Sequence, residues 1–388
     1  LGTNGTLSAG FIQGITPKGD VSASINHRSD KLSLSSSGSY SHGRYHSDMD
    51  LTNWIGDSVY AQFNRNFRLQ NNGAFRIGAD YQLHDKHSVG IQYNTGMGRP
   101  EWRGHSETNI YRKSSMLRDS FLIANSNADI RDYNHNLTLN YRFADTSGTE
   151  LTIDADQGRF SNLHKAYQPN TYWNPELNQV LTIRNYQMNT QVDINIWSLK
   201  SDFSKTLGKH GKLGAGAKYS NVISRNNFEF FNVTFGENGP DPERTNDFTY
   251  REEIMAAYTN YAATIGKLEL QAGFRVERTR SGSDLKALKT VNSRNVDTSY
   301  VNLFPSASLA YNFSQKHSMN LNYRHSIDRP GYQDLNPFER KLDELSYEQG
   351  NPFMRPMYTH SLELGYTFMQ MATITIGYNR TSNYFTDL

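Results

Sequence analysis

Regular alternation between apolar and polar residues is the feature that most restricts what this chain can fold into. Apolar side chains occupy the even positions of residues 268–276, and most odd positions of residues 301–313. A period of two places each set on one face of a β-strand. The pattern recurs at residues 75–81, 89–93, 137–143, 319–323 and 362–368. No comparable stretch has the helical period, and no apolar run approaches the roughly 18 residues of a transmembrane helix. We therefore predict an all-β chain.

The alternating segments predict about fifteen strands, most of them roughly ten or more residues long. That length is close to what a tilted strand needs to cross a bilayer. The predicted strands are 3–14, 20–29, 31–43, 72–83, 88–98, 131–144, 149–162, 188–206, 212–226, 250–265, 267–281, 299–313, 317–327, 359–369 and 371–386.

The connections between these strands alternate in length. Short polar turns are expected at residues 29–30, 84–87, 145–148, 208–211, 266, 314–316 and near 370. Long polar connections are expected at residues 44–71, 99–130, 163–187, 227–249, 282–298 and 328–358. This pattern is typical of a transmembrane antiparallel β-barrel, with short periplasmic turns at one rim and long extracellular loops at the other. The sequence thus predicts a multi-pass barrel in the lipid bilayer of a bacterial outer membrane.

The composition is consistent with such a barrel. Hydrophobic residues are only 36% and the mean hydropathy is −0.72, values that in a soluble chain favour disorder. The chain nevertheless has 24 Tyr and 20 Phe, and barrels use aromatic residues at the membrane interfaces while the lumen side stays polar. The 40 basic and 38 acidic residues give a net charge of +2, which does not support nucleic-acid binding. Without cysteine, disulfides and thiolate metal sites are excluded.

Two predicted hairpins, residues 81–93 and 311–323, share one plan. Each has Tyr at both ends and a turn that contains Lys-His-Ser. We interpret them as a shared solution for a hairpin, with a functional repeat as the alternative. One break in the alternation, where Ile196 is followed by Trp197, predicts a β-bulge that would return Trp197 to the lipid side.

Motifs in the last third of the chain carry a family resemblance. Arg329-Pro330 precedes a long connection, and Gly350-Asn-Pro-Phe-Met-Arg-Pro356 introduces a strand that contains Glu363-Leu-Gly-Tyr366. This arrangement resembles the barrel of TonB-dependent outer-membrane receptors. Residues 1–10, 253–261 and 302–309 resemble one branch, the outer-membrane barrel family common in Bacteroidetes. The motif residues, to which we assign a structural role, are Arg329, Pro330, Gly350, Asn351, Pro352 and Pro356.

The resemblance extends over the whole chain and implies a function. Such receptors take up nutrients that are too large or too scarce for porins. Outer loops and lumen capture the ligand, and a TonB-type energy-coupling complex then rearranges a plug domain of the same polypeptide. Receptors of this kind have about 22 strands. We therefore expect residues 1–388 to be one barrel domain that is partial, with about 15 of about 22 strands, no plug domain and the last strands missing. The intact polypeptide would extend beyond both ends.

Two of the long connections hold the candidates for ligand binding. Aromatic and arginine side chains are favoured as binding anchors, and outer loops are where a receptor meets its ligand. Packing between loops and anchoring at the membrane interface are the alternative roles of these residues. The candidates are Trp102, His105 and Tyr111 in the connection 99–130, and His164, Tyr167, Tyr172 and Trp173 in the connection 163–187.

The sequence offers no support for an enzyme. The 12 histidines are dispersed, without the His-Glu-x-x-His pattern of a zinc site, and no Gly-x-Ser-x-Gly elbow is present. We therefore expect no metal, no cofactor and no catalytic turnover. Three other functions remain as alternatives: a barrel scaffold without transport in a surface-protein secretion or lipoprotein complex, a diffusion porin, and a soluble β-sandwich.

Overall fold

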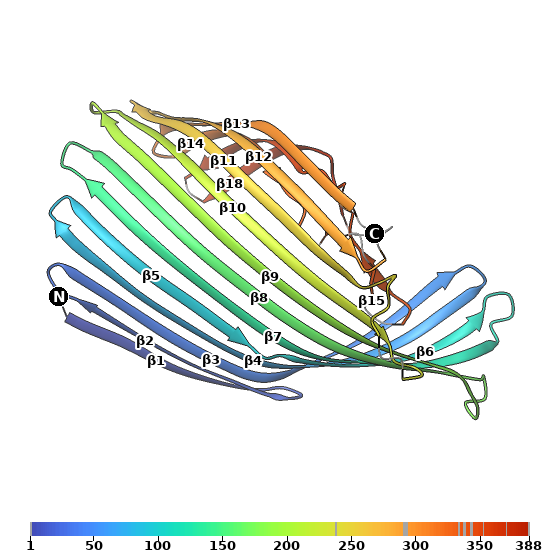
Figure 1. Cartoon of the computed structure of the whole chain (residues 1–388). Coiled ribbons are helices and arrows are strands. Elements are labelled where there is room, and N and C mark those ends of the chain that lie inside the picture. Colours follow the sequence, from blue (N-terminus) through green and yellow to red (C-terminus); the bar gives the residue numbers. More distant parts are fainter. Residues whose placement is uncertain are drawn as a thin grey trace.

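The chain is built from β-strands alone, as the alternation predicts. The computed structural model describes residues 2–236, 239–289, 294–332, 334–336, 339–341, 344–351, 353–369 and 371–386. Within these residues it has eighteen strands and no helix (Figure 1). They are β1 (Gly2–Gln13), β2 (Pro17–Arg28), β3 (Leu32–Ile55), β4 (Ser58–His84), β5 (His87–Gly98), β6 (Glu101–Arg112), β7 (Arg118–Ala144), β8 (Thr149–Trp173), β9 (Val180–Leu207), β10 (Gly211–Asn232), β11 (Asn246–Ile265), β12 (Leu268–Ala287), β13 (Arg294–Ser314), β14 (His317–Asp328), β15 (Glu339–Lys341), β16 (Tyr347–Gln349), β17 (Met357–Phe368) and β18 (Ala372–Ser382). None of the described residues belongs to a helix that could span a membrane.

One antiparallel sheet contains nearly all of the strands. Its order is β1-β2-β3-β4-β5-β7-β8-β9-β10-β11-β12-β13-β14-β17-β18, which gives fifteen positions and confirms the predicted number. β6 lies off this path because it pairs with the outer parts of β4 and β7, directly beyond the end of β5. β5 and β6 are separated at Arg99-Pro100, where proline has no N–H for the ladder. β15 and β16 form a small sheet of their own.

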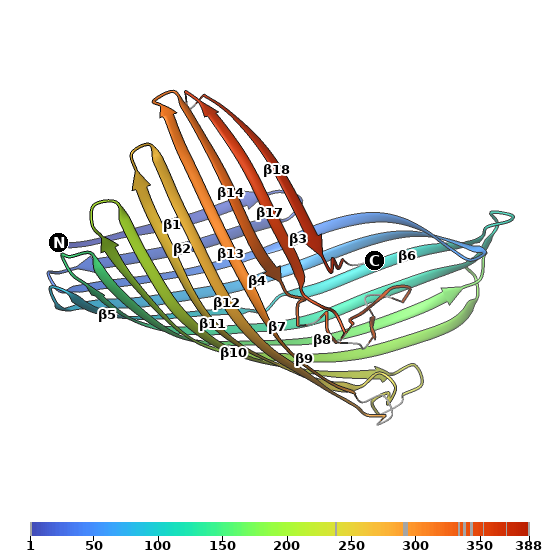
Figure 2. The same ribbon diagram turned by 90° about the horizontal axis from the view of Figure 1, so that it is seen from above.

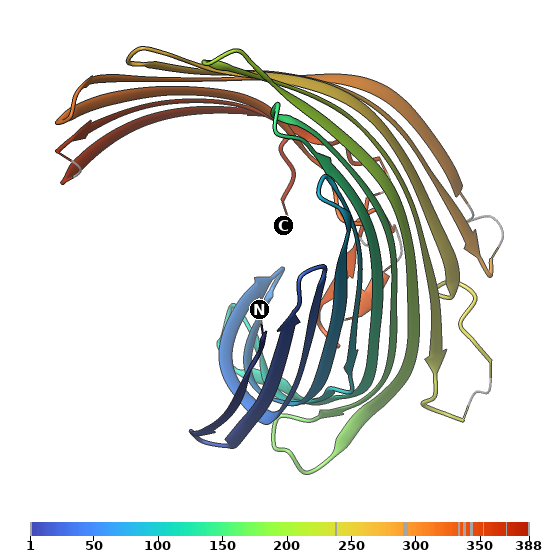
Figure 3. The ribbon, with the colours of Figure 1, turned by 90° about the vertical axis from the view of Figure 1, so that its left-hand side faces the viewer.

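The large sheet curves into a trough with a concave inner face and a convex outer face (Figures 2 and 3). In the part of the chain that the structure describes, β1 and β18 are its edges. The short turns at one rim lie where they were predicted, apart from the turn near residue 370, which falls on a residue outside the described ones. Three of them contain glycine in the left-handed region, with φ of 77° at Gly148, 63° at Gly208 and 62° at Gly266, where a side chain would be disfavoured.

Three of the outer connections differ from the prediction, because most of their residues are strand. The expected loop 44–71 is the outer part of the β3–β4 hairpin, which pairs up to Ile55 and Ser58. Residues 99–130 contain β6 and the start of β7, and residues 163–187 contain the end of β8 and the start of β9. Beyond the bilayer the convex face no longer meets lipid, and the concave face buries polar as well as apolar side chains. The alternation that reveals a membrane strand is therefore lost there.

The predicted β-bulge before Trp197 is wrong. β9 pairs with β10 without a register shift, and its alternation continues through this region. Trp197 and Leu199 are 60% and 52% exposed on the convex face, whereas Val192 is buried on the concave face. The break in the sequence pattern arises because the concave face also carries apolar residues near its outer end. One cluster of these consists of Ala128, Ala166, Tyr186, Met188, Phe228 and Phe230.

The two similar hairpins lie in structurally equivalent units of three strands. In β4-β5-β7, His87 bonds the hydroxyl of Tyr141 at 2.8 Å; in β13-β14-β17, His317 bonds the hydroxyl of Tyr366 at 2.5 Å. A second pair follows further out in each unit, Tyr93 with His135 at 2.7 Å and Tyr323 with His360 at 2.9 Å. The structural similarity therefore extends beyond the two hairpins to the next strand of each unit, β7 and β17, which the sequence comparison of the hairpins did not reveal. Rings with polar tips of this kind suit the membrane interfaces.

Candidate ligand-binding site on the concave face

The described residues of the segment between β14 and β17 lie inside the trough. We call residues 329–356 the inner segment; it contains β15 and β16 and crosses the concave face (Figure 2). At its start Arg329 contacts β11 and β12. Further along, Glu344 contacts β8 and β9. The predicted long connection 328–358 therefore narrows the space enclosed by the sheet.

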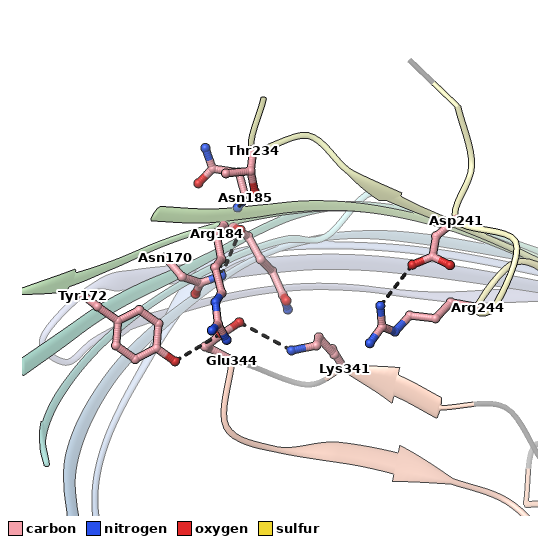
Figure 4. Close-up of polar contacts among 10 residues, drawn as sticks. Asn170, Tyr172, Arg184, Asn185, Thr234, Asp241, Arg244, Lys341 and Glu344 are labelled. Carbon is pink, nitrogen blue, oxygen red and sulfur yellow. Dashed lines mark hydrogen bonds and ion pairs between the residues drawn. The ribbon is translucent and has the colours of Figure 1, made fainter. Parts of the chain in front are cut away.

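Glu344 fastens the middle of the inner segment to the wall (Figure 4). Its side chain is only 1% exposed. The carboxylate accepts hydrogen bonds from the Tyr172 hydroxyl on β8 at 3.1 Å and from Arg184 Nη1 on β9 at 3.2 Å. Lys341 Nζ, in the inner segment itself, donates at 3.4 Å. A buried carboxylate is costly unless it is paired and hydrogen-bonded, and here three donors satisfy it.

Aromatic rings complete the surroundings of Glu344. Lys341 Nζ lies 4.7 Å from the centre of the Tyr186 ring, and the Arg184 guanidinium lies 5.4 Å from the Tyr172 ring. Such cation–π contacts add to the ion pairs when they are shielded from water. Burial raises the pKa of Tyr172 and of Tyr186, and the negative charge of Glu344 raises both further. Both hydroxyls therefore stay protonated at neutral pH, and that of Tyr172 can donate to Glu344.

Arg329 fastens the start of the inner segment. It forms a close ion pair with Glu277 on β12, donates to Thr279 Oγ1 at 3.0 Å, and places Nε 3.6 Å from Glu252 on β11. Arg275 also donates to Glu277, at 2.6 and 3.0 Å. Both carboxylates are almost fully buried. Removing one partner of a buried ion pair leaves an uncompensated charge, so Arg329 holds the segment and the wall together.

The other motif residues shape the return of the inner segment toward β17. The Gly350 N–H donates to the Asn336 carbonyl at 2.9 Å, and the Asn351 N–H donates to the Asp334 carbonyl at 2.7 Å. A Cβ at Gly350 would lie 2.4 Å from both of these carbonyl oxygens, so only glycine fits. These contacts support a structural role for the motif. Pro352 lies outside the described residues.

A pocket of about 570 Å³ lies between the inner segment and β11, β12 and β13. This volume is in the usual range of ligand pockets. Its wall is partly aromatic, and its charged residues are Glu252, Arg329 and Arg355. The residues that line it are Tyr250, Glu252, Ser281, Gly282, Ser283, Val296, Thr298, Tyr300, Arg329, Pro330, Leu335, Phe353, Met354, Arg355, Pro356, Tyr358 and Asn383.

Comparison with known proteins agrees with this architecture. A model of the outer membrane protein beta-barrel family matches residues 141–387. The chain belongs to this family. It is accordingly a protein of the outer membrane, as the sequence predicted. No curated protein matches it in sequence.

Several solved structures are similar to this chain. The ferric citrate transporter FecA, solved in the unliganded form, has a TM-score of 0.54 at 14% identity, over 94% of this chain and 48% of FecA. The chain thus spans about half of FecA. The toluene transporter TodX of Pseudomonas putida has a TM-score of 0.33 at 11% identity, over 99% of this chain and 88% of TodX. The ferric yersiniabactin uptake receptor FyuA of Yersinia pestis has a TM-score of 0.24 at 11% identity, over 97% and 74%.

The candidate residues from the sequence lie on strands of this barrel wall, and the prediction that they occupy loops is wrong. The alternation along β6 and β8 separates them onto two faces. On the concave face are Trp102, His164 and Tyr172, and on the convex face are His105, Tyr111, Tyr167 and Trp173. They therefore do not form one site. Tyr172, one of the seven, contacts Glu344.

His105 and Trp173 show why residue type alone was a poor guide to the ligand-binding residues. His105 lies next to Glu107 at 3.1 Å and Asn125 at 2.8 Å on the outer face of β6. Trp173 is the last residue of β8, at a register shift opposite Val180. The sequence did not reveal Glu344 or Arg184, because a single charged residue in a polar segment carries no periodic signal. No cluster of three or more His, Asp or Glu suited to a metal ion occurs among the described residues.

Proposed function

We propose that this chain forms the barrel wall of a TonB-dependent receptor that takes up a large or scarce nutrient. The observation that carries the proposal is the inner segment, which is held against the concave face by two buried ionic clusters at Arg329 and Glu344. A diffusion pore needs an open lumen, whereas a receptor needs a lumen whose residues contact its ligand. The shared fold with FecA and the motif around Gly350 also support the proposal.

The proposed mechanism has two stages. The outer strands and the inner segment bind the ligand on the concave face. A plug domain of the same polypeptide then moves under force from a TonB-type energy-coupling complex in the inner membrane. No covalent step is involved, so no catalytic residue and no cofactor are required. Binding at the outer rim and movement through the lumen therefore depend on different parts of the protein.

Growth on a limiting nutrient tests the proposal. Strains with and without this protein are grown with a ferric siderophore, a glycan, a peptide mixture or a vitamin as the limiting nutrient. A second pair of strains lacks the energy-coupling complex. We expect one nutrient to require both the protein and the complex. If growth on every nutrient is independent of the protein, the proposed uptake function is wrong.

Two further readouts separate the alternatives. The intact protein should stay closed in planar bilayers, and a persistently open pore would indicate a porin instead. A scaffold role with a surface lipoprotein as partner predicts a different defect, in which surface proteins are lost from the cell while uptake of every nutrient is normal. Loss of surface proteins and nutrient uptake are both measured in the deletion strain, and conductance is measured with the purified protein.

A further inference from the structure

The wall of the barrel opens between β13 and β14 at the outer rim. β13 pairs with β12 along its length, from Tyr311 to Arg294. Its pairing with β14 ends at Ser306 and Arg324, although β14 itself continues to Asp328 and stays paired with β17. Beyond Ser306 the two strands are therefore no longer joined by a ladder. We call this opening the β13 cleft.

Pro305 explains where the ladder ends. Successive residues of a strand direct their backbone groups alternately to the two neighbouring strands. The Leu303 carbonyl faces β14, because His325 Nδ1 donates to it at 2.8 Å. Pro305, two residues on, faces the same way and has no N–H to donate. The ladder therefore stops at Pro305, and the side chain of His325 replaces a backbone partner at Leu303.

Along the cleft, backbone N–H and C=O groups of β13 have no neighbouring strand to pair with among the described residues. By the same alternation, Val301, Ser299 and Asp297 direct their N–H and C=O groups into the cleft. None of these groups bonds another element in the part of the chain that the structure describes. Besides the His325 bond, Asn302 Nδ2 donates across the cleft to the Tyr358 hydroxyl at 3.1 Å, and the rings of Phe304 and His325 lie 5.5 Å apart. Three residues with free backbone groups, spaced by roughly 6.6 Å, match the repeat of an extended chain.

The pocket of about 570 Å³ lies beside this edge. β13 contributes Val296, Thr298 and Tyr300 to its lining, and the opposite side includes Arg355 and Tyr358. Within the lining, Glu252 and Arg329 form an ion pair. Arg355 is partnered by no carboxylate among the described residues, so the lining has one excess positive charge. The pocket therefore combines aromatic surface, hydroxyl groups and a cation next to free backbone donors and acceptors.

We propose that the β13 cleft binds a short acidic peptide in extended conformation. The peptide backbone adds to β13 as a further strand, which is an established mode of peptide recognition. A carboxylate of the peptide pairs with Arg355, and its side chains contact Tyr300 and Tyr358. Acidic peptides would then be the ligand class for the uptake proposed above. Only transport of the bound peptide rests on that proposed function. Binding itself is independent of transport.

Peptide binding to the intact purified protein in detergent tests the proposal. The probe is dye-labelled acetyl-Thr-Val-Glu-Val-Thr-amide, measured by fluorescence anisotropy. Two further peptides carry N-methyl groups on one or the other alternating set of backbone amides. In strand addition only one set faces β13, and each lost hydrogen bond weakens the complex. We expect at least tenfold weaker binding for one methylated peptide and a much smaller change for the other.

Variants of the protein locate the site. Ser299→Pro removes an N–H that faces the cleft and should weaken binding tenfold or more, whereas Ser299→Ala retains the N–H and should bind normally. Arg355→Gln should reduce the preference for the Glu peptide over its Gln counterpart by about threefold. If Ser299→Pro does not fold, the methylated peptides still decide the question with the unaltered protein.

Three results would overturn the proposal: no binding of the probe at millimolar peptide, equal binding of both methylated peptides and the parent, or normal binding by folded Ser299→Pro. Failure of the proposed uptake function gives a different result, because the peptide then binds the purified protein while growth on peptides is independent of it. Uptake without binding at the cleft would instead show that the ligand uses another part of the lumen.

Discussion

Single buried charges hold the inner segment of this protein in place. Glu344 has almost no contact with water, and its three donors come from β8, β9 and β15. Arg184 is about half exposed at 54%, so part of its attraction to Glu344 is screened by solvent. The hydrogen bonds to the buried carboxylate therefore contribute more to holding the inner segment against the wall than the charge of Arg184 alone.

Replacing Glu344 tests this anchor. Glu344→Gln keeps the shape of the side chain but removes the charge, and hydrogen bonds to a charged group contribute about 1.5–3 kcal/mol. We expect faster amide hydrogen exchange in residues 339–349 and unchanged exchange in β11 and β12. Glu363→Gln, at an exposed position on β17, is the matched control. Equal exchange in the two variants would show that Glu344 does not fasten the segment.

Gly350 offers a second test at the scale of one residue. Gly350→Ala places a Cβ 2.4 Å from two backbone carbonyl oxygens, and overpacking of this kind costs about 1–3 kcal/mol. The return of the inner segment should loosen, with faster exchange at residues 334–336 and 350–351. Gly377→Ala on β18 is the control, because no atom lies within 4 Å of its added Cβ. A Gly350→Ala protein that exchanges like Gly377→Ala would contradict the prediction.

At the scale of whole elements, the sequence predicted the membrane part of each strand but not its full length. Residues 188–206 were predicted as one strand, and the structure extends it to Val180 and Leu207. Membrane strands show the alternation because one face meets lipid and the other the lumen. Outside the bilayer the hydrogen-bonded ladder still holds β8 and β9 together, but the convex face no longer meets lipid and the buried concave face mixes polar and apolar residues, so no regular alternation marks it in the sequence.

The candidate site was predictable only in part, for the same reason. The motif residues Arg329 and Gly350 were identified by resemblance, and the structure gives each a specific contact. The partners of Arg329 are Glu252 and Glu277, which come from strands about 50 to 80 residues earlier in the chain. Such contacts depend on where the inner segment crosses the trough, and no local pattern encodes this path. Aromatic content alone pointed to residues that are divided between the two faces, of which Tyr172 contacts Glu344.

The opening beside β13 gives a prediction at the element scale. Pro305→Val restores an N–H that faces β14, and each new backbone hydrogen bond contributes about 0.5–1.5 kcal/mol. The ladder can then continue toward Asp328, so residues 325–328 should exchange more slowly and the probe peptide should bind less tightly. Ala307→Val, two residues further along the same face of β13, is the control. If Pro305→Val leaves both exchange and binding unchanged, proline is not the cause of the cleft.

At the scale of the whole molecule, the convex face of one strand passes from lipid to water. Leu199 and Ile183 both lie on the convex face of β9 and are 52% and 46% exposed. Leu199 lies in the part predicted to cross the bilayer, whereas Ile183 lies far beyond it. An arginine near the bilayer midplane costs about 2–4 kcal/mol on the lipid face of a barrel, and close to nothing outside it.

This difference can be measured with the two variants in lipid vesicles. Leu199→Arg should lower the free energy of unfolding by about 2–4 kcal/mol, measured in guanidinium chloride, and Ile183→Arg should leave it almost unchanged. The matched pair keeps the strand, the face and the introduced residue the same. A similar loss in both variants would mean that the membrane does not end between these positions.

The outer part of β9 also determines how this protein meets its surroundings. From Trp197 to Val180 the strand covers roughly 55 Å at 3.3 Å per residue, and its pairing with β8 continues to Trp173. Because it is paired along its length, this projection is a rigid β-hairpin and not a flexible loop, and it extends well above the lipid headgroups. Its tip is therefore within reach of antibodies and bacteriophages that cannot approach the membrane surface, and those agents would be expected to select for changes at residues 174–179.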